Sequence, residues 1–289
     1  MRVLITGGRG LLGRELKLLL EDEYELYSWG KEELDITDSK EVIAKIIELN
    51  PDIVIHGAAY VDADGCEKNI DLAYRVNAYG TRNIAIACQQ SKSEMIYISS
   101  DYVFDGKKGS PYLEFDNPNP INIYGKTKLA GEEFVKSLLN QYFIVRTAWL
   151  YGDYGNDFIK TMLKLAKERE FVNIVKDQVG TPTYVKDLVE AIKIILDSKL
   201  YGIYHATNDG EASWYEFAKR IFEYSNSQVK VKAVTSQEFV SAAARPAYSV
   251  LNNYSLEQGF GYKMRDWEIA LEDYWKNKIK DDGGLDDVR

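Results

Sequence analysis

A glycine-rich loop between a short apolar strand and a helix is the feature that most constrains this chain. Residues 2–5 are apolar after the first arginine, residues 6–13 read Thr-Gly-Gly-Arg-Gly-Leu-Leu-Gly, and residues 14–20 have helical composition. The glycine spacing satisfies both Gly-x-x-Gly-x-x-Gly and Gly-x-Gly-x-x-Gly. Because glycine has no Cβ atom, backbone amides at the helix N-terminus can approach a pyrophosphate. The pattern favours dinucleotide binding over a plain turn, and the residues predicted to border the cofactor here are Gly7, Gly10, Leu11, Leu12 and Gly13.

Apolar runs alternate with segments of helical spacing along most of the remaining chain. This alternation predicts an α/β fold with a Rossmann-type, doubly wound parallel sheet and a smaller C-terminal substrate-binding lobe. After residue 140 the predicted elements are a strand at 142–146, helices at 158–169 and 185–198, a strand at 202–205 and a helix at 214–224. The predicted units are a dinucleotide-binding domain at 1–148, a mainly substrate-binding lobe at 149–280 with segments that return to the main sheet, and a disordered acidic tail at 281–289.

Tyr124 and Lys128 are four residues apart at the start of a predicted helix and therefore share one helix face. A phenol with a pKa of about 10 transfers protons poorly near neutral pH unless a nearby cation lowers that pKa. Upstream, the apolar run 95–98 ends in Ser99 and Ser100, which predicts a buried strand that delivers a hydroxyl at its carboxyl end. In isolation Tyr-x-x-x-Lys is more often an exposed helical pair. The preceding strand-end serine favours a catalytic role.

A serine, tyrosine and lysine in this order, behind an N-terminal glycine-rich loop, resemble the extended branch of the short-chain dehydrogenase/reductase superfamily. Further spaced blocks, from Arg2 to about Trp275, resemble the dTDP-4-dehydrorhamnose reductase family. The chain departs from the family pattern at Ser100, where threonine is more frequent, and at Gly65, where lysine is usual; Gly65 lies in a loop expected to border the substrate. The blocks are SDYVFDG at 100–106, YGKTKLAGE at 124–132, RTAWLYG at 146–152, DFIKTM at 157–162, DQVGTPT at 177–183 and RPAYSVL at 245–251.

The resemblance implies reduction of the C4 keto group of dTDP-4-dehydro-L-rhamnose by a nicotinamide cofactor. In that reaction Tyr124 would donate the proton and Ser100 would orient the substrate oxygen. Lys128 would lower the pKa of Tyr124 and hold the nicotinamide ribose. Without the resemblance, Trp149 is more simply a core side chain and Arg245 is equally credible as a surface arginine. The substrate contacts that the resemblance implies are Ser100, Asp101, Tyr102, Tyr124, Trp149 and Arg245.

The end of the second predicted strand bears on cofactor choice. An NAD-selective Rossmann site tends to carry a carboxylate there, whereas this chain has Trp-Gly-Lys at 29–31 and no carboxylate before Glu32. Lys31 can meet a 2′-phosphate or remain solvated, so we expect NADPH to be used, with NADH also accepted. Small residues after the strand at 52–56 suit close passage of a flat cofactor, although tight packing alone also explains them. By resemblance, the remaining cofactor contacts are Asp35, Ile36, Ala58, Ala59 and Tyr60, and Asn77 matches the structural asparagine of the family.

Charge and composition exclude several other classes of protein. The net charge of −9 and the pI near 5.0 argue against nucleic-acid and anionic-membrane partners. Two cysteines without metal spacing and only two histidines argue against a zinc site and a Ser-His-Asp hydrolase. No apolar stretch approaches the roughly 18 residues of a membrane span, and no secretory signal is evident. We therefore expect a cytoplasmic chain with reduced cysteines. The expected partner is a dTDP-4-keto-6-deoxy sugar. The sequence does not decide whether the chain forms a homodimer. It also does not decide whether the chain uses the Mg²⁺ that some family members bind at a subunit contact, and we assign no metal ligand.

Two alternative functions remain at this stage. One is a different sugar-nucleotide enzyme of the same superfamily, such as an epimerase or a dehydratase. Many dehydratases carry acidic residues straight after the serine or threonine, whereas here Asp101 is followed by Tyr102. The other is a non-catalytic regulatory subunit like the β subunit of methionine adenosyltransferase, which resembles these reductases. The complete serine, tyrosine and lysine set favours catalysis.

Overall fold

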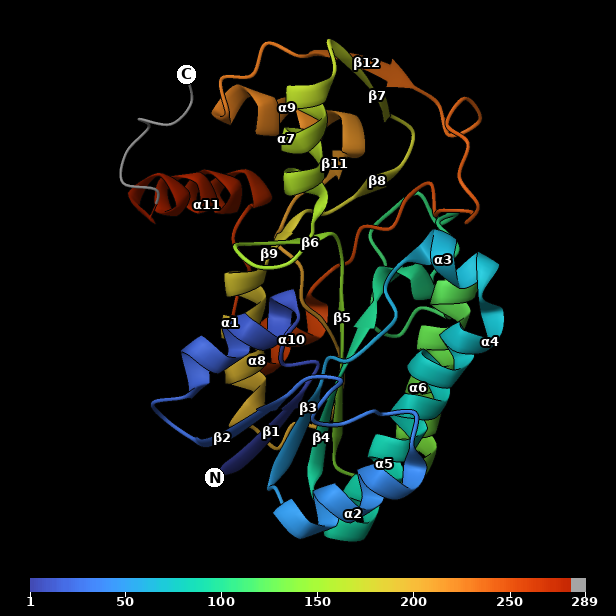
Figure 1. Ribbon diagram of the computed structural model, residues 1–289, viewed down its shortest axis with the longest axis vertical. Helices are drawn as coiled ribbons and strands as arrows, with labels where there is room; N and C mark the ends of the chain where they lie inside the picture. The colour runs from blue at the N-terminus through green and yellow to red at the C-terminus, as the bar shows by residue number, and fades with distance from the viewer. Residues whose placement is uncertain (282–289) are drawn as a thin grey trace.

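Six parallel strands form the central sheet of the computed structural model, which describes residues 1–281 (Figure 1). Their order across the sheet is β10-β5-β4-β3-β1-β2. The inner strands are short runs of Val, Ile and Met that are buried on both faces, as parallel sheets require. The predicted α/β fold with a Rossmann-type parallel sheet is confirmed. The strands are β1 (Arg2–Thr6), β2 (Glu25–Trp29), β3 (Ile53–His56), β4 (Glu94–Ser100), β5 (Tyr142–Thr147) and β10 (Gly202–His205).

Helices cover both faces of this sheet (Figure 1). Helices α1 (Leu11–Leu20) and α8 (Val185–Leu196) pack on one face, and their leucines and isoleucines join one apolar core. Helices α2 (Ser39–Leu49), α5 (Thr81–Ser91) and α6 (Ile123–Leu138) pack on the other face around a second core. Each apolar stripe follows helical spacing, so burial of that stripe orients the helix on the sheet.

Side-chain caps define where two of these helices begin. The Asp38 carboxylate accepts hydrogen bonds from Lys40 N and Glu41 N at the start of α2. The Asn122 side chain accepts one from Gly125 N at 2.8 Å and begins α6. Such caps satisfy backbone amides that have no partner inside the helix. The cap at Asn122 therefore places Tyr124 in the first turn of α6.

A π-helical turn interrupts the long helical segment that contains Asn77. Helices α3 (Ala63–Lys68) and α4 (Ile70–Ala73) lead into η1 (Tyr74–Gly80), which continues as α5. The Asn77 side chain is fully buried; its Oδ1 accepts from Tyr60 N at 2.7 Å and its Nδ2 donates to Tyr60 O at 3.0 Å. Nδ2 also donates to Thr127 Oγ1 at 3.0 Å. Asn77 thus ties the segment after β3 to α6.

The C-terminal part of the chain builds a smaller lobe above the carboxyl ends of the strands (Figure 1). There β7 (Phe171–Val175) pairs with β12 (Lys230–Val234) beside α7 (Phe158–Glu168), α9 (Trp214–Tyr224) and α11 (Trp267–Asp281). Two further strand pairs of two residues each lie in this part of the chain. Helix α10 (Tyr254–Phe260) packs beside β10. Strand β10 and helix α8 return to the main sheet. The further elements are η2 (Asp101–Val103), β6 (Leu150–Tyr151), β8 (Val179–Gly180), β9 (Thr183–Tyr184), β11 (Ala212–Ser213) and α10 (Tyr254–Phe260).

Predicted and observed elements in this part of the chain agree closely. The predicted strand at 202–205 and helix at 214–224 have the observed bounds, and the helices predicted at 158–169 and 185–198 end one and two residues early. The predicted disordered tail begins at Asp281, which instead ends α11; residues 282–289 lie outside the described part of the chain.

Candidate active site

A cavity of about 820 Å³ opens at the carboxyl ends of the central strands. Its walls come from the glycine loop after β1, the segment 57–61 after β3, the end of β4, the first turns of α6 and the segment 147–150. In the sheet order β3 and β2 lie on opposite sides of β1, which is the switch point where ligands bind in open α/β sheets. The volume falls within the range of cofactor and ligand pockets.

Two glycines of the glycine loop have no room for a side chain, because neighbouring backbone lies too close. Gly7 has a φ of +76°, and a Cβ atom there would lie 2.7 Å from Ala58 N. A Cβ atom at Gly13 would lie 2.4 Å from the Gly7 carbonyl oxygen. Larger residues would therefore distort the loop. The structure places all the predicted loop contacts in the cavity wall, namely Gly7, Gly10, Leu11, Leu12 and Gly13.

One end of the cavity lies beside the carboxyl end of β2, where the adenosine of a dinucleotide is expected. Lys31, Asp35 and Ile36 line it, as predicted. The Asp35 carboxylate accepts from Thr37 N at 3.0 Å and Thr37 Oγ1 at 2.8 Å. These hydrogen bonds lower the pKa of Asp35, and the one from the Thr37 backbone has the larger effect. Asp35 is therefore held as a fixed carboxylate.

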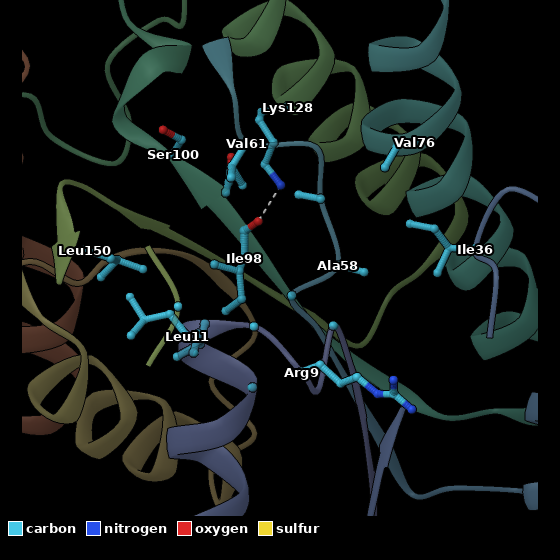
Figure 2. Close-up of a pocket in the computed structure, with 18 of the residues that line it drawn as sticks. Arg9, Leu11, Ile36, Ala58, Val61, Val76, Ile98, Ser100, Lys128 and Leu150 are labelled. Carbon is cyan, nitrogen blue, oxygen red and sulfur yellow. Dashed lines mark hydrogen bonds between the residues drawn. The ribbon is translucent and has the colours of Figure 1, made fainter. Parts of the chain in front are cut away.

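Arg9 is a cavity residue that sequence reasoning missed (Figure 2). Its exposed side chain forms ion pairs with Glu32, at 2.6 Å, and with Glu33. The Arg9 side chain passes directly over Gly30, where a Cβ atom would lie 2.8 Å from Arg9 Cγ. The signal in the sequence was a basic residue inside the glycine loop, combined with a glycine at the end of β2.

Ser100, Tyr124 and Lys128 all line the cavity, at the end of β4 and the start of α6. The Lys128 side chain is 3% exposed, and its Nζ donates a 2.6 Å hydrogen bond to the Ile98 carbonyl oxygen (Figure 2). That ammonium also lies 4.2 Å from the centre of the Tyr97 ring. The Ser100 hydroxyl donates to Asp101 Oδ1 at 2.9 Å. The three predicted catalytic side chains thus meet around one space.

Burial governs the ionisation of this group. It raises the pKa of Tyr124 well above its ordinary range, opposed by a hydrogen bond from Ser100 and reinforced by Asp101 and Tyr102. Burial also lowers the pKa of Lys128 to about 7, opposed by the charge of Glu132. The phenol is therefore protonated at neutral pH. Lys128 is not among the groups that shift the pKa of Tyr124, and its ammonium donates to the Ile98 carbonyl oxygen. Its role in lowering the pKa of Tyr124 stays a prediction.

Asp101 also lines the cavity, directly after Ser100. Its carboxyl group is 2% exposed, and burial raises its pKa to about 6, against hydrogen bonds from Ser249 and Ser100. The carboxylate and the serine hydroxyl therefore share one hydrogen-bonded unit. The Ser100 proton is therefore directed at Asp101.

Trp149 forms part of the cavity wall. Its backbone has a φ of +47°, which is unusual for a bulky side chain. The indole stacks on Trp214, with ring centres 3.4 Å apart and planes 7° apart. On another side it packs against Gly180, where a Cβ atom would lie 2.5 Å from the indole. The small lobe therefore holds Trp149 rigidly.

Three predicted site residues lie outside the cavity wall, although Ala58 and Ala59 line it. The Tyr60 hydroxyl points toward Gly65 of α3. Tyr102 packs edge-on against Tyr124, with ring centres 5.7 Å apart. Arg245 pairs with Asp64 at 3.1 Å, and that carboxylate also accepts from Ala243 N. Local sequence could not predict these directions, because each depends on α3 or the 243–245 segment packing nearby.

Neither histidine contributes an acid or base to the cavity. His56 is buried between Thr6 and Thr81, with Nδ1 2.7 Å from Thr6 Oγ1 and Nε2 3.1 Å from Thr81 Oγ1. Burial lowers the pKa of both His56 and His205 to about 3. They are neutral structural groups. Among residues 1–281 no cluster of three or more His, Cys, Asp or Glu side chains could bind a metal ion, and no helix is long and apolar enough to cross a membrane.

The match to known proteins extends over nearly the whole chain. Residues 1–279 match the family model described as the RmlD substrate binding domain. The chain belongs to this family. The spore coat polysaccharide biosynthesis protein SpsK of Bacillus subtilis is 41% identical over 96% of this chain and 98% of its own. The dTDP-4-dehydrorhamnose reductase of Aggregatibacter actinomycetemcomitans is 40% identical over 94% and 97%.

Solved structures of dTDP-4-dehydrorhamnose reductases share this fold. The crystal structure of dTDP-4-dehydrorhamnose reductase from Bacillus anthracis, in complex with NADP, has 50% identity and a TM-score of 0.93. The match covers 96% of this chain and 99% of that one. The family predicted from the spaced sequence blocks is therefore confirmed.

Proposed function

We propose that this chain catalyses the NADPH-dependent reduction of the C4 keto group of dTDP-4-dehydro-L-rhamnose to dTDP-L-rhamnose. The observation that carries the proposal is a single cavity in which the glycine cradle meets Ser100, Tyr124 and Lys128. The names of the RmlD-family relatives support the same reaction. An oxidoreductase is thus favoured over a binding protein, since a binding protein needs no proton donor beside a dinucleotide cradle.

The roles of the three side chains follow from their ionisation and placement. Tyr124 is protonated at neutral pH because burial raises its pKa, so it can donate a proton to the substrate oxygen. Ser100 exchanges its hydrogen bond to Asp101 for one to the same oxygen and orients that oxygen. Lys128, in its ammonium form, stabilises the phenolate that Tyr124 becomes. When bound, NADPH supplies the hydride.

The residues around the cavity fit a dinucleotide along its whole length. Gly7, Gly10 and Gly13 line the part of the cavity where the pyrophosphate would lie, and Asp35 lies at the adenosine end. Arg9 and Lys31 supply two cations for a 2′-phosphate beside β2. This pair supports NADPH use, with NADH also accepted because the site contains no group that excludes it. Trp149, rigidly stacked, is proposed to pack against the sugar.

The test is turnover by the purified protein, followed by NADPH absorbance with dTDP-4-dehydro-L-rhamnose as substrate. We expect NADPH consumption and a product whose NMR spectrum shows the rhamno configuration, and none with Tyr124→Phe. Turnover only with an epimeric 4-keto sugar would show that the substrate is wrong. Cofactor binding without turnover of any 4-keto sugar nucleotide would favour the regulatory-subunit alternative.

The cellular setting and assembly are part of the same proposal. A nucleotide-sugar substrate and two free, buried cysteines, Cys66 and Cys88, support a cytoplasmic enzyme. We propose a homodimer as the assembly to test, by light scattering with and without Mg²⁺. A monomer under both conditions would overturn that part and leave the reaction unaffected.

A further inference from the structure

A buried ion pair lies directly beneath the catalytic side chains. Tyr124, Lys128 and Glu132 recur at four-residue intervals and share one face of α6. Glu132 is fully buried and meets Arg146 of β5, which is 1% exposed. Arg146 donates through Nε to Oε1 at 2.9 Å and through Nη2 to Oε2 at 2.7 Å. This two-point pairing fixes the carboxylate in one orientation.

The same carboxylate holds the end of β4. Ser99 Oγ donates to Glu132 Oε1 at 2.6 Å, and Ser99 is the register partner of Arg146 across the β4–β5 ladder. Ser99 precedes Ser100 in the chain and itself lines the cavity. Two side-chain hydrogen bonds therefore join α6 to the end of β4. One runs from Lys128 to the Ile98 carbonyl oxygen, and the other runs from Ser99 to Glu132.

Stability alone gives a weak reason for this arrangement. Removing two charges from water costs several kcal/mol per ion, and well-packed apolar side chains often replace a buried pair without loss of stability. The other neighbours of Arg146 are weak: its Nη1 lies 3.4 Å from Glu114 O and 3.5 Å from His205 Nε2, and its guanidinium lies over Phe104. Its strong contacts all converge on Glu132.

The carboxylate also contributes charge to the reaction site. The ionisable groups that face Lys128 are Tyr124 and Glu132 on α6, Tyr97 on β4 and His56 on β3. Burial keeps Tyr97, Tyr124 and His56 neutral. Glu132 is thus the anionic group in this set that favours the ammonium form of Lys128.

We propose that Glu132, held between Arg146 and Ser99, is a positioning residue that seats the serine end of β4 against α6 and keeps Lys128 charged for proton transfer. The inference rests on the proposed reductase function and adds to it a role for a residue that does not touch the substrate. This role explains why a buried ion pair lies here: Glu132 accepts a hydrogen bond from Ser99 on β4, and its charge acts on Lys128 on α6.

The test compares Glu132→Gln and Glu132→Asp with the control Asp187→Asn, which breaks the partly buried Arg265–Asp187 pair in the part of the molecule away from the cavity. Glu132→Gln should lower kcat at least tenfold while the NADPH Kd stays within a few-fold. The loss of kcat/KM with rising pH should move to lower pH by about one unit, because a favourable charge is removed. Glu132→Asp should restore the pH profile, and Asp187→Asn should lower only the melting temperature.

A folded Glu132→Gln variant with the wild-type kcat and pH profile would overturn the inference. If that variant does not fold, Ser99→Ala replaces it. The ion pair remains, the lost hydrogen bond should lower the melting temperature modestly, and kcat should fall several-fold, whereas an unchanged kcat would refute the positioning role. Absence of wild-type turnover would instead refute the proposed function. NMR titration of the Lys128 ammonium in wild type and Glu132→Gln then tests the charge role independently of activity.

Discussion

Replacement of Lys128 by methionine should make the protein more stable and the enzyme inactive. Burial lowers the pKa of Lys128 from 10.5 to about 7. Well below pH 7 the side chain is charged in both the folded and unfolded chain, so the full cost of burying the ammonium applies, on the order of 5 kcal/mol. Methionine removes that cost but leaves the Ile98 carbonyl oxygen without its 2.6 Å partner, which costs about 1–3 kcal/mol.

The stability gained by Lys128→Met should depend on pH, and this dependence separates the cost of burying the ammonium from the lost hydrogen bond at Ile98. Above pH 7 the folded protein releases the proton while the unfolded chain keeps it, so the cost of burial falls by about 1.4 kcal/mol per pH unit until it vanishes near 10.5. The lost hydrogen bond at Ile98 does not depend on pH. The advantage of Lys128→Met over wild type should therefore shrink by about 3 kcal/mol between pH 6 and pH 9.

Urea unfolding of both cofactor-free proteins at pH 6, 7.5 and 9 measures this difference, and Lys193→Met, at a partly exposed lysine paired with Glu23, serves as control. A difference between wild type and Lys128→Met that stays constant across these pH values would refute a lowered pKa at Lys128. The same variant should lose both NADPH affinity and turnover. If only turnover fell, the proposed contact with the ribose would be wrong.

Three further changes test other parts of the site. Tyr124→Phe should abolish reduction while the NADPH Kd, measured by fluorescence, stays within a few-fold. Turnover of this variant at the wild-type rate would show that Tyr124 is not the proton donor. Arg9→Ala should lower the kcat/KM ratio of NADPH to NADH more than Lys31→Ala does, and high salt should weaken both effects; equal ratios in all three proteins would show that neither cation meets the 2′-phosphate. Gly180→Ala should displace Trp149 and destabilise the protein by about 1–3 kcal/mol, with a raised KM for the sugar nucleotide, and an unchanged KM would argue against substrate packing on the indole.

The parts of the site that are local in sequence could be predicted. The glycine loop, the serine at the end of β4 and the Tyr124–Lys128 spacing each depend on a few consecutive residues and on the periods of strand and helix. Parallel strands end at the same edge of a sheet, so these separate motifs were expected to meet. The structure brings them to one cavity for that reason.

The parts that depend on tertiary packing could not be predicted. The direction of Arg9 follows from the missing side chain at Gly30, more than twenty residues away. The pairing of Glu132 with Arg146 joins a helix to a neighbouring strand, and no local pattern links the two positions. Arg245 was expected to contact the substrate, but its direction is set by Asp64 on a helix far away in the chain.

The late arrival of β10 has a consequence for how the chain folds during synthesis. Strand β5 pairs with β4 on one side and with β10 on the other. While the ribosome makes residues 148–201, the β5 side of the sheet has no partner strand and presents unpaired backbone groups. At about 5–20 residues per second, this exposure lasts several seconds. Nascent chains that pause in this interval are the ones we expect to recruit chaperones or to aggregate through β5.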